Sequence, residues 1–240
     1  KGSYQSEGDS DILELHELKK GDESIVLIGS IKNLVHPQMD LHLKADLSAE
    51  EWLKLLPLDS LDISSGSAAA DLQIEGKFHE WGKWSKSELQ ASKIEGFIQL
   101  KNMSISSKNL VQDIENLTGK LSAQGNEIRI ENLSFKTGES DILLNGNITN
   151  LWSYLLLDDA ILGLNAELQS DQIALNDFVQ QTEEPSNNTG NIEFARRLQA
   201  DFSLKLKAFS YQNFSAKMLK GRLIVSENLI KGENISLLAD

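Results

Sequence analysis

Residues 71–78, DLQIEGKF, alternate between apolar and polar side chains, and this alternation decides the fold. Leu72, Ile74 and Phe78 share one side of an extended backbone, whereas charged and amide side chains occupy the other side. The same alternation recurs in MDLHLKADL (39–47), LGLNAEL (162–168) and DFSLKLKA (201–208). Strands with one apolar and one polar side are typical of an antiparallel sheet with one solvated face. We therefore expect an all-β protein.

Two segments leave the alternation and predict short helices. In LSAEEWLKLLP (47–57), Ser48 and Glu51 have the spacing of a capping box, and Pro57 would end the helix. In LNDFVQQ (175–181), Asn176 is a candidate cap, with Asp177 in the first turn, where the helix dipole favours an acidic side chain. Helical connections that would build a doubly wound α/β sheet are scarce.

Two pairs of segments indicate internal repeats. ESIVLIGSIKNL (23–34) matches SDILLNGNITNL (140–151), with Gly29 and Gly146 separated by 117 positions. The predicted helices begin 128 positions apart, and the eleven extra positions fall in or near WSYLLLDDA (152–160). LTGKLSAQGNEIRIENLSF (117–135) matches LKGRLIVSENLIKGENISL (219–237) at an offset of 102.

These repeats predict one continuous repetitive fragment over residues 1–240. We expect residues 1–59 to be the tail of one unit, residues 60–179 a complete unit, and residues 198–240 the front of the next. Residues 180–197 are polar, contain Pro185 and Gly190 and keep neither a helical nor a strand period, so they predict a mobile loop.

A short pattern of Asn, an apolar residue and Ser occurs four times, in KNMSI (101–105), ENLSF (131–135), QNFSA (212–216) and ENISL (233–237). Each copy is formally a glycosylation acceptor. Apolar residues have even spacing up to each Asn and change parity directly after it, which a strand achieves only with a bulge or a sharp bend. Asn tolerates the left-handed backbone of such a bend. We therefore predict bends at Asn102, Asn132, Asn213 and Asn234 rather than sugar sites.

Composition excludes several classes of function. The formal net charge of −13 opposes nucleic-acid binding, because such binding requires basic side chains to displace phosphate counterions. The four His residues are scattered without metal-ligand spacing, cysteine is absent, and no nucleophile elbow, phosphate-binding loop or dinucleotide fingerprint occurs. We expect no enzyme activity, no metal and no cofactor.

The start of the chain, KGSYQSEGDSD, has no initiator Met and no signal-peptide core. No apolar run approaches the roughly 20 residues of a membrane-spanning helix. We expect the sequence to be a piece of a longer protein, with any anchor outside it.

The apolar side of the predicted strands is too extensive for helices of this chain to cover. A second sheet, a sheet that curls over itself, or a ligand would have to shield it. A lipid acyl chain of about sixteen carbons would gain about 12 kcal/mol in gross terms, at about 0.8 kcal/mol per buried methylene. The candidate lining residues, which would act collectively, are Leu72, Ile74, Phe78, Ile98, Leu100, Leu162, Leu164, Leu168, Phe202, Leu204 and Leu206.

A family resemblance is carried by GFIQLKNMSI (96–105), by the run IENLTGKLSAQGNEIRIENLSFKTGESDILLNGNITNL (114–151) and by LNAELQSDQIALNDF (164–178). Over most of residues 60–179 the chain resembles the C-terminal region of AsmA-like proteins of diderm bacteria. The resemblance implies a long, curled antiparallel sheet of repeated units that forms an apolar groove, here with two short helices. It also implies a periplasmic location, with a tether to the inner membrane outside this chain, and no catalytic residues.

Two hypotheses for function follow. The first is a non-enzymatic periplasmic segment that holds or conducts phospholipid or other acyl-lipid chains between the inner and outer membranes and serves envelope homeostasis. Membrane association would then use parts of the protein outside this chain. The second is a structural or adhesive β-repeat protein whose two sheets pack into a dry core.

Overall fold

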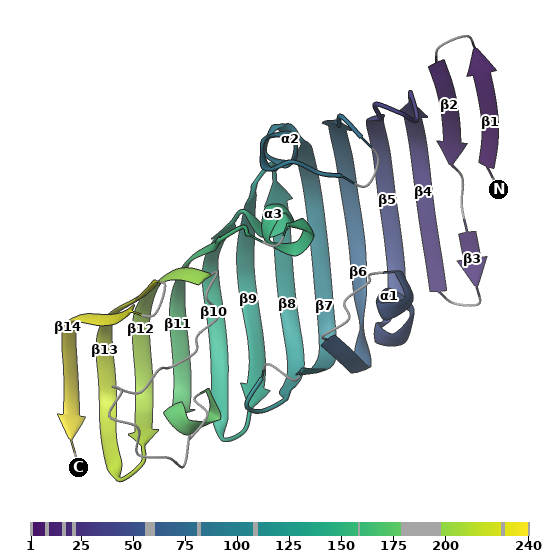
Figure 1. Ribbon diagram of the computed structural model, residues 1–240. Helices are drawn as coiled ribbons and strands as arrows, with labels where there is room; N and C mark the ends of the chain where they lie inside the picture. Colours follow the sequence, from purple (N-terminus) through teal and green to yellow (C-terminus); the bar gives the residue numbers. More distant parts are fainter. Residues whose placement is uncertain are drawn as a thin grey trace, which may run out of the picture.

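The protein is one open, mostly antiparallel β-sheet (Figure 1). The computed structural model describes residues 2–7, 10–15, 18–20, 23–55, 61–80, 83–107, 110–157, 159–178, 198–226 and 229–239. The strands are β1 Gly2–Glu7, β2 Ser10–Leu15, β3 Leu18–Lys20, β4 Glu23–Lys32, β5 Gln38–Ser48, β6 Leu61–Lys77, β7 Lys93–Ser107, β8 Ile114–Gln124, β9 Glu127–Thr137, β10 Ser140–Thr149, β11 Leu162–Ala174, β12 Leu198–Tyr211, β13 Phe214–Ser226 and β14 Leu229–Ala239. The eleven strands from β4 to β14 lie side by side in sequence order.

Neighbouring strands are antiparallel with one exception, because β11 and β12 run parallel. Parallel neighbours need a long connection between them, and residues 175–197 supply it. The predicted mobile loop at 180–197 lies outside the described residues.

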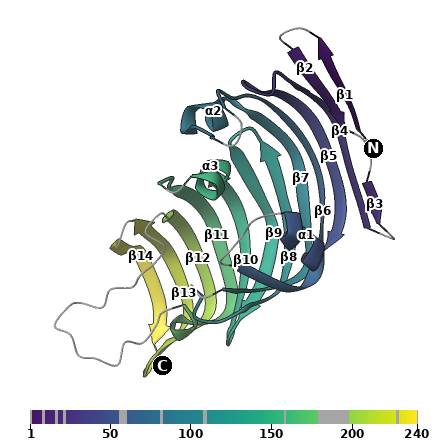
Figure 2. The ribbon, with the colours of Figure 1, turned by 45° about the vertical axis from the view of Figure 1, so that its right-hand side comes forward.

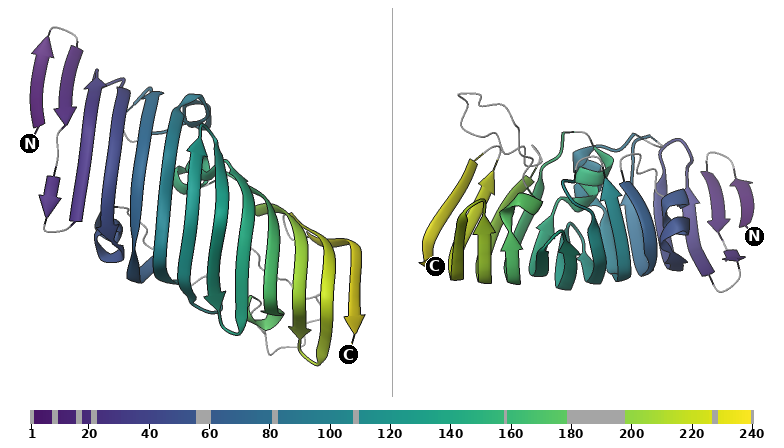
Figure 3. Two further views of the ribbon diagram at one scale, coloured as in Figure 1. Left: turned by 180° about the vertical axis from the view of Figure 1, so that it is seen from behind. Right: turned by 90° about the horizontal axis from the view of Figure 1, so that it is seen from below.

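The sheet is neither closed nor strongly curled (Figures 2 and 3), so the strong curl expected from the family resemblance is wrong. Within the described residues, β1 and β14 each pair on one side only and form the two edges of the sheet. The antiparallel pairing that the alternation predicts is confirmed for all described strand pairs but one.

Within the described ranges, three short helices accompany the sheet: α1 Ala49–Leu55, α2 Lys86–Ala91 and α3 Leu151–Leu156. The helix predicted after Ser48 is confirmed as α1. The helix predicted at Asn176 is wrong, since the described part of that segment forms only a 3₁₀ turn at Leu175–Asp177. Helix α3 occupies the eleven-residue insertion between the matching repeats. Helix α2 was not predicted, although Ser85 and Glu88 form a complete capping box at its start.

Left-handed asparagines mark bulges in three of the four predicted places. Asn102, Asn132 and Asn234 have φ of 48°, 49° and 51°, and the ladder register shifts beside each of them. In β9, Glu131 and Asn132 together face the single residue Asn145 of β10, so the apolar side is the same before and after the bulge.

The prediction for Asn213 is wrong. Tyr211 pairs directly with Phe214, so Gln212 and Asn213 form a two-residue turn between β12 and β13. Gln212 has the left-handed φ of 51°. In this part of the sheet the bulge is on β13, at Met218, whose φ is 54°.

Each bulged asparagine lies opposite a glycine of the preceding strand. A Cβ built on Gly66, Gly119 or Gly221 would lie within about 3 Å of the residue that follows Asn102, Asn132 or Asn234, respectively. The glycines have φ of 92°, 155° and 155°, a backbone region that residues other than glycine rarely adopt. The close approach explains why the repeat carries a glycine at this position.

The repeat at offset 102 is confirmed in the backbone. Every residue pair between β8 and β9 from Thr118↔Ser134 to Gln124↔Glu127 has its counterpart between β13 and β14, from Lys220↔Ser236 to Ser226↔Leu229. The sequence match therefore reflects the same strand pairing, bulge included.

Gly96 gives a direct test of close strand approach. Its φ is +128° and an added Cβ would lie 1.9 Å from the backbone oxygen of Asp71, whereas Gly125 has φ +63° and open space around it. We expect Gly96→Ala to lower the free energy of unfolding by about 2–5 kcal/mol, from backbone strain and overlap combined. The control Gly125→Ala should cost only about 1–2 kcal/mol. Urea denaturation measures both, and equal losses would contradict the account.

Candidate functional site: an apolar face that crosses the sheet

Two rows of apolar residues run in register across the sheet from β4 to β14. The first row is Leu27, Leu43, Leu72, Gly96, Ala123, Ile128, Ile148, Leu164, Ala200, Val225 and Ile230. The second row is Ile25, Ala45, Ala70, Ile98, Leu121, Ile130, Gly146, Ala166, Phe202, Leu223 and Gly232. Residues paired in register lie on one side of a sheet, so both rows belong to a single surface, which we call the apolar face.

Neither row contains a polar side chain. Eleven strands at a spacing of about 4.8 Å give the rows a length of about 48 Å. The bulges extend the apolar face toward the far strand ends, because Met103 and Leu133 lie on the same side as Leu100 and Ile130, respectively.

Helices border the apolar face at both ends of the strands (Figures 1 and 2). Trp52 of α1 packs on the Ala70–Leu72 region and donates its indole N–H to the backbone oxygen of Ala68 at 2.9 Å. Trp152 of α3 packs on the same cluster from the other helix. Its buried indole N–H has no acceptor among the described residues.

Most of the predicted lining residues lie together on the apolar face. Leu72, Ile98, Leu164 and Phe202 are members of the two rows. Ile74, Leu100, Leu168, Leu204 and Leu206 pair in register just beside the rows, and Leu162 is half-buried at the start of β11. Leu204, Leu206 and Leu72 are buried, and the others except Phe78 are half-buried.

Phe78 differs from the other predicted lining residues. It lies beyond the end of β6, donates its backbone N–H to the oxygen of Pro37 at 2.9 Å and packs edge-on against Trp84. Its ring also covers Gly76. Phe78 therefore closes the strand end near α2 rather than extending the rows.

The lining residues predicted from the sequence did not include any residue of β9 or β10. Ile128 and Ile130, which are 2% and 3% exposed, are among the most deeply buried row members and lie in a central strand of the sheet. Trp52 and Trp152 were also left out. The sequence could have identified both tryptophans, because each is a large aromatic residue in a short segment between strands. A side chain of this size has to pack on the adjacent sheet.

The opposite face carries charges in cross-strand ladders. Lys205 of β12 contacts Glu167 of β11 at 2.7 Å, and Arg222 of β13 donates to Asp201 of β12. The hydrogen bond from Arg222 holds the pKa of Asp201 below its usual range. Hydrogen bonds from Lys205 and then Gln169 lower the pKa of Glu167. These contacts join the parallel pair β11–β12 and the following strand on the solvated side.

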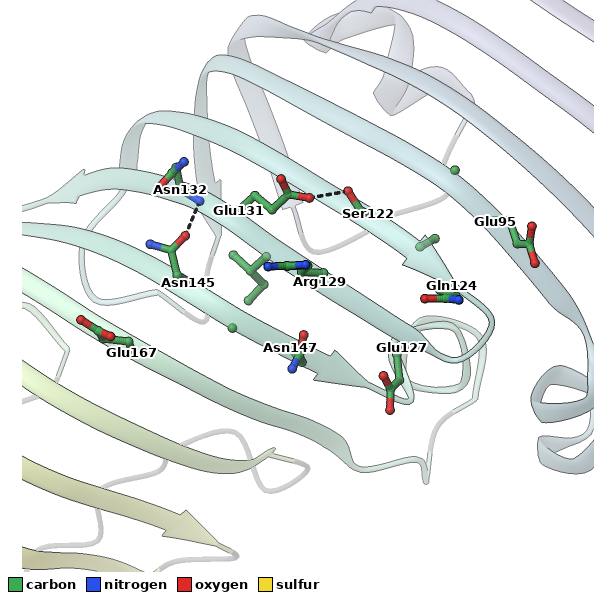
Figure 4. Close-up of a pocket in the computed structure, with 14 residues that line it drawn as sticks. Glu95, Ser122, Gln124, Glu127, Arg129, Glu131, Asn132, Asn145, Asn147 and Glu167 are labelled. Atoms are coloured by element: carbon green, nitrogen blue, oxygen red, sulfur yellow. Dashed lines mark hydrogen bonds between the residues drawn. The ribbon is translucent and has the colours of Figure 1, made fainter.

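An open depression of about 1020 Å³ lies on this charged face (Figure 4). Arg129, Asn147 and four glutamates, Glu95, Glu127, Glu131 and Glu167, are among its lining residues. Ser122 donates a hydrogen bond to Glu131 and lowers its pKa, and Asn145 accepts the N–H of the bulge residue Asn132. Several polar groups that line the depression therefore form hydrogen bonds between neighbouring strands.

Comparisons with known proteins return no match, whether to family models, to curated proteins or to solved structures. The described residues contain no cluster of His, Asp or Glu suited to a metal ion. Among the helices in the described ranges, none has the length and hydropathy needed to cross a bilayer.

The ion pair between Asp201 and Arg222 predicts a pH-dependent contribution to stability. Because folding lowers the pKa of Asp201 below its ordinary 3.8, the contribution is complete above that value and is lost as pH falls through the lower folded value. The guanidinium is half exposed, so solvent screens the pair and its contribution is small. We expect Asp201→Asn to lower the free energy of unfolding at pH 7, with a difference from the parent protein that shrinks as the pH falls below 3.8. A difference that stays constant in urea titrations across this range would contradict the assignment.

Proposed function

We propose that the apolar face holds acyl chains of phospholipid and that the chain is a non-enzymatic, lipid-conducting segment of the AsmA-like type. The observation that carries the proposal is the pair of uninterrupted apolar rows, which cross eleven strands without a polar side chain. Half-buried row members such as Leu27, Leu43, Ile148 and Leu164 leave part of this surface in contact with solvent. Contiguous exposed apolar patches on soluble proteins mark interaction sites.

An acyl chain suits the geometry of this surface. The rows consist of aliphatic side chains, glycines and Phe202, which offer dispersion contacts and no side-chain hydrogen-bonding groups. Gly96 pairs with Ala123 and Gly146 pairs with Ala166, so two pairs of small residues stand among larger aliphatic side chains. Helices α1 and α3 stand at its two borders and would confine a chain between them.

The proposal extends to location and transport. A periplasmic segment with this face would shield acyl chains from water between the inner and outer membranes, with its tether supplied by a part of the protein outside this chain. The gross gain of about 0.8 kcal/mol for each buried methylene would favour loading. No polar side chain interrupts either row along the path of a chain from strand to strand.

The alternative, a structural β-repeat protein with a dry core, requires a second sheet. The described residues form a single sheet, so a second layer would have to come from outside the described residues. Photo-crosslinking distinguishes these two cases.

A photoreactive residue in place of Leu164, in cells of a diderm bacterium, should capture phospholipid. Leu164 is half-buried on the apolar face, and its neighbour Asn165 is exposed on the opposite face and provides the matched control. We expect lipid adducts at Leu164 and at least tenfold fewer at Asn165, measured by mass spectrometry of the purified protein. Capture of protein neighbours alone at Leu164 would contradict the proposal.

A further inference from the structure

Exposed lysines gather at one end of the strands, beside helix α2 (Figure 1). Residues 32–38 run from the end of β4 to the start of β5, and residues 77–80 and 83–93 belong to the connection from β6 to β7. We call these three segments the α2 end. They contain two glutamates and five exposed lysines, a formal net charge of +3 in a chain whose net charge is −13. The lysines are Lys32, Lys77, Lys83, Lys86 and Lys93.

Hydrogen bonds join the segments of the α2 end into one surface. Phe78 donates its backbone N–H to the oxygen of Pro37 at 2.9 Å. Nδ1 of His36 forms a hydrogen bond with the backbone oxygen of His79, and the two imidazole rings stack with their centroids 5.0 Å apart. Glu88 of α2 in turn accepts the backbone N–H of His79. The lysines are therefore carried by connected elements and not by independent loops.

Exposed aliphatic side chains lie at the same end of the strands. Oδ1 of Asn33 accepts the backbone N–H of Val35 at 3.1 Å, in a turn that leaves Leu34 and Val35 38% and 66% exposed. Helix α3 contacts α2 at this end of the sheet (Figures 1 and 2). Leu156 of α3 and Ile161, just before β11, are 51% and 38% exposed. Basic and aliphatic side chains thus occur together at this end.

We propose that the α2 end docks on the surface of a bilayer that contains anionic phospholipid. The lysine ammonium groups would contact headgroup phosphates, and Leu34 and Val35 would enter the boundary between the headgroups and the acyl chains. A nucleic acid would match the lysines but would leave the aliphatic side chains in water. The inference does not depend on acyl chains held by the apolar face, because it uses side chains outside the two rows.

The acidic excess of the whole chain is compatible with this docking. β5 and β6 extend 11 and 17 residues away from the α2 end, which is roughly 35 Å or more at about 3.3 Å per residue. Charge interactions are screened over about 8 Å at physiological ionic strength. The nearer carboxylates Asp40, Glu75 and Glu95 lie two positions inward along their strands, so the lysines at the strand ends would be closer to the bilayer.

Co-sedimentation of the complete 240-residue chain with vesicles tests the proposal. We expect binding to vesicles of equal parts phosphatidylglycerol and phosphatidylcholine, about tenfold weaker binding to pure phosphatidylcholine, and a loss of binding as salt is raised. Lys86→Glu should weaken binding to the anionic vesicles at least about fivefold. An acidic residue suits the first turn of α2, so this variant should fold. Val35→Asp should weaken binding to a similar extent, because its side chain would no longer enter the bilayer.

Lys101→Glu and Ile28→Asp are the matched controls. Lys101 is exposed on β7 toward the opposite strand ends, and Ile28 is 54% exposed on the charged face. Each control should change vesicle binding by less than about twofold, and far-UV circular dichroism checks that every variant keeps its sheet. Equal losses in the controls and in the α2-end variants would overturn the proposal. Equal binding to both kinds of vesicle, or no binding to either, would overturn it as well.

Discussion

Strict alternation of side chains along a β-strand is the constraint on which the rest of this structure depends. In a strand whose apolar spacing changes parity, every later apolar side chain would face water if no bulge were present, and burying each such side chain is worth about 1.5–3 kcal/mol. The left-handed asparagines insert one extra residue where the apolar spacing changes parity. Met103 and Leu133 therefore stay on the apolar face instead of facing solvent.

The bulges at Asn102 and Asn132 each involve three strands rather than one. A glycine of the preceding strand allows the backbone to come close, the asparagine takes the left-handed conformation, and a side-chain oxygen of the following strand accepts the displaced N–H. This three-strand unit explains why glycine and asparagine recur together in the sequence repeat.

The alternation predicted the strands and the side of the sheet that Leu72, Leu164 and Leu204 occupy, because the period of two is a local property of the chain. The prediction of a bend at Asn213 was wrong for a physical reason. A two-residue turn shifts the spacing of apolar residues in the sequence as a bulge does, and only the pairing of the strands distinguishes the two. The parallel pair β11–β12 depends on the path of residues 175–197, which alternation does not encode. Strong curl depends on the summed twist of many strands, which no single segment determines.

The central claim is that acyl chains lie on the apolar face, and methyl NMR with a phospholipid spin-labelled near the end of its acyl chain tests it most directly. Paramagnetic broadening should be strongest for the methyl groups of Leu72, Ile148 and Leu164 in the first row. The methyl groups of Ile28 and Ile224, on the opposite face, should remain sharp. Broadening confined to the exposed edge residues Leu229 and Leu238, or equal on both faces, would contradict the account.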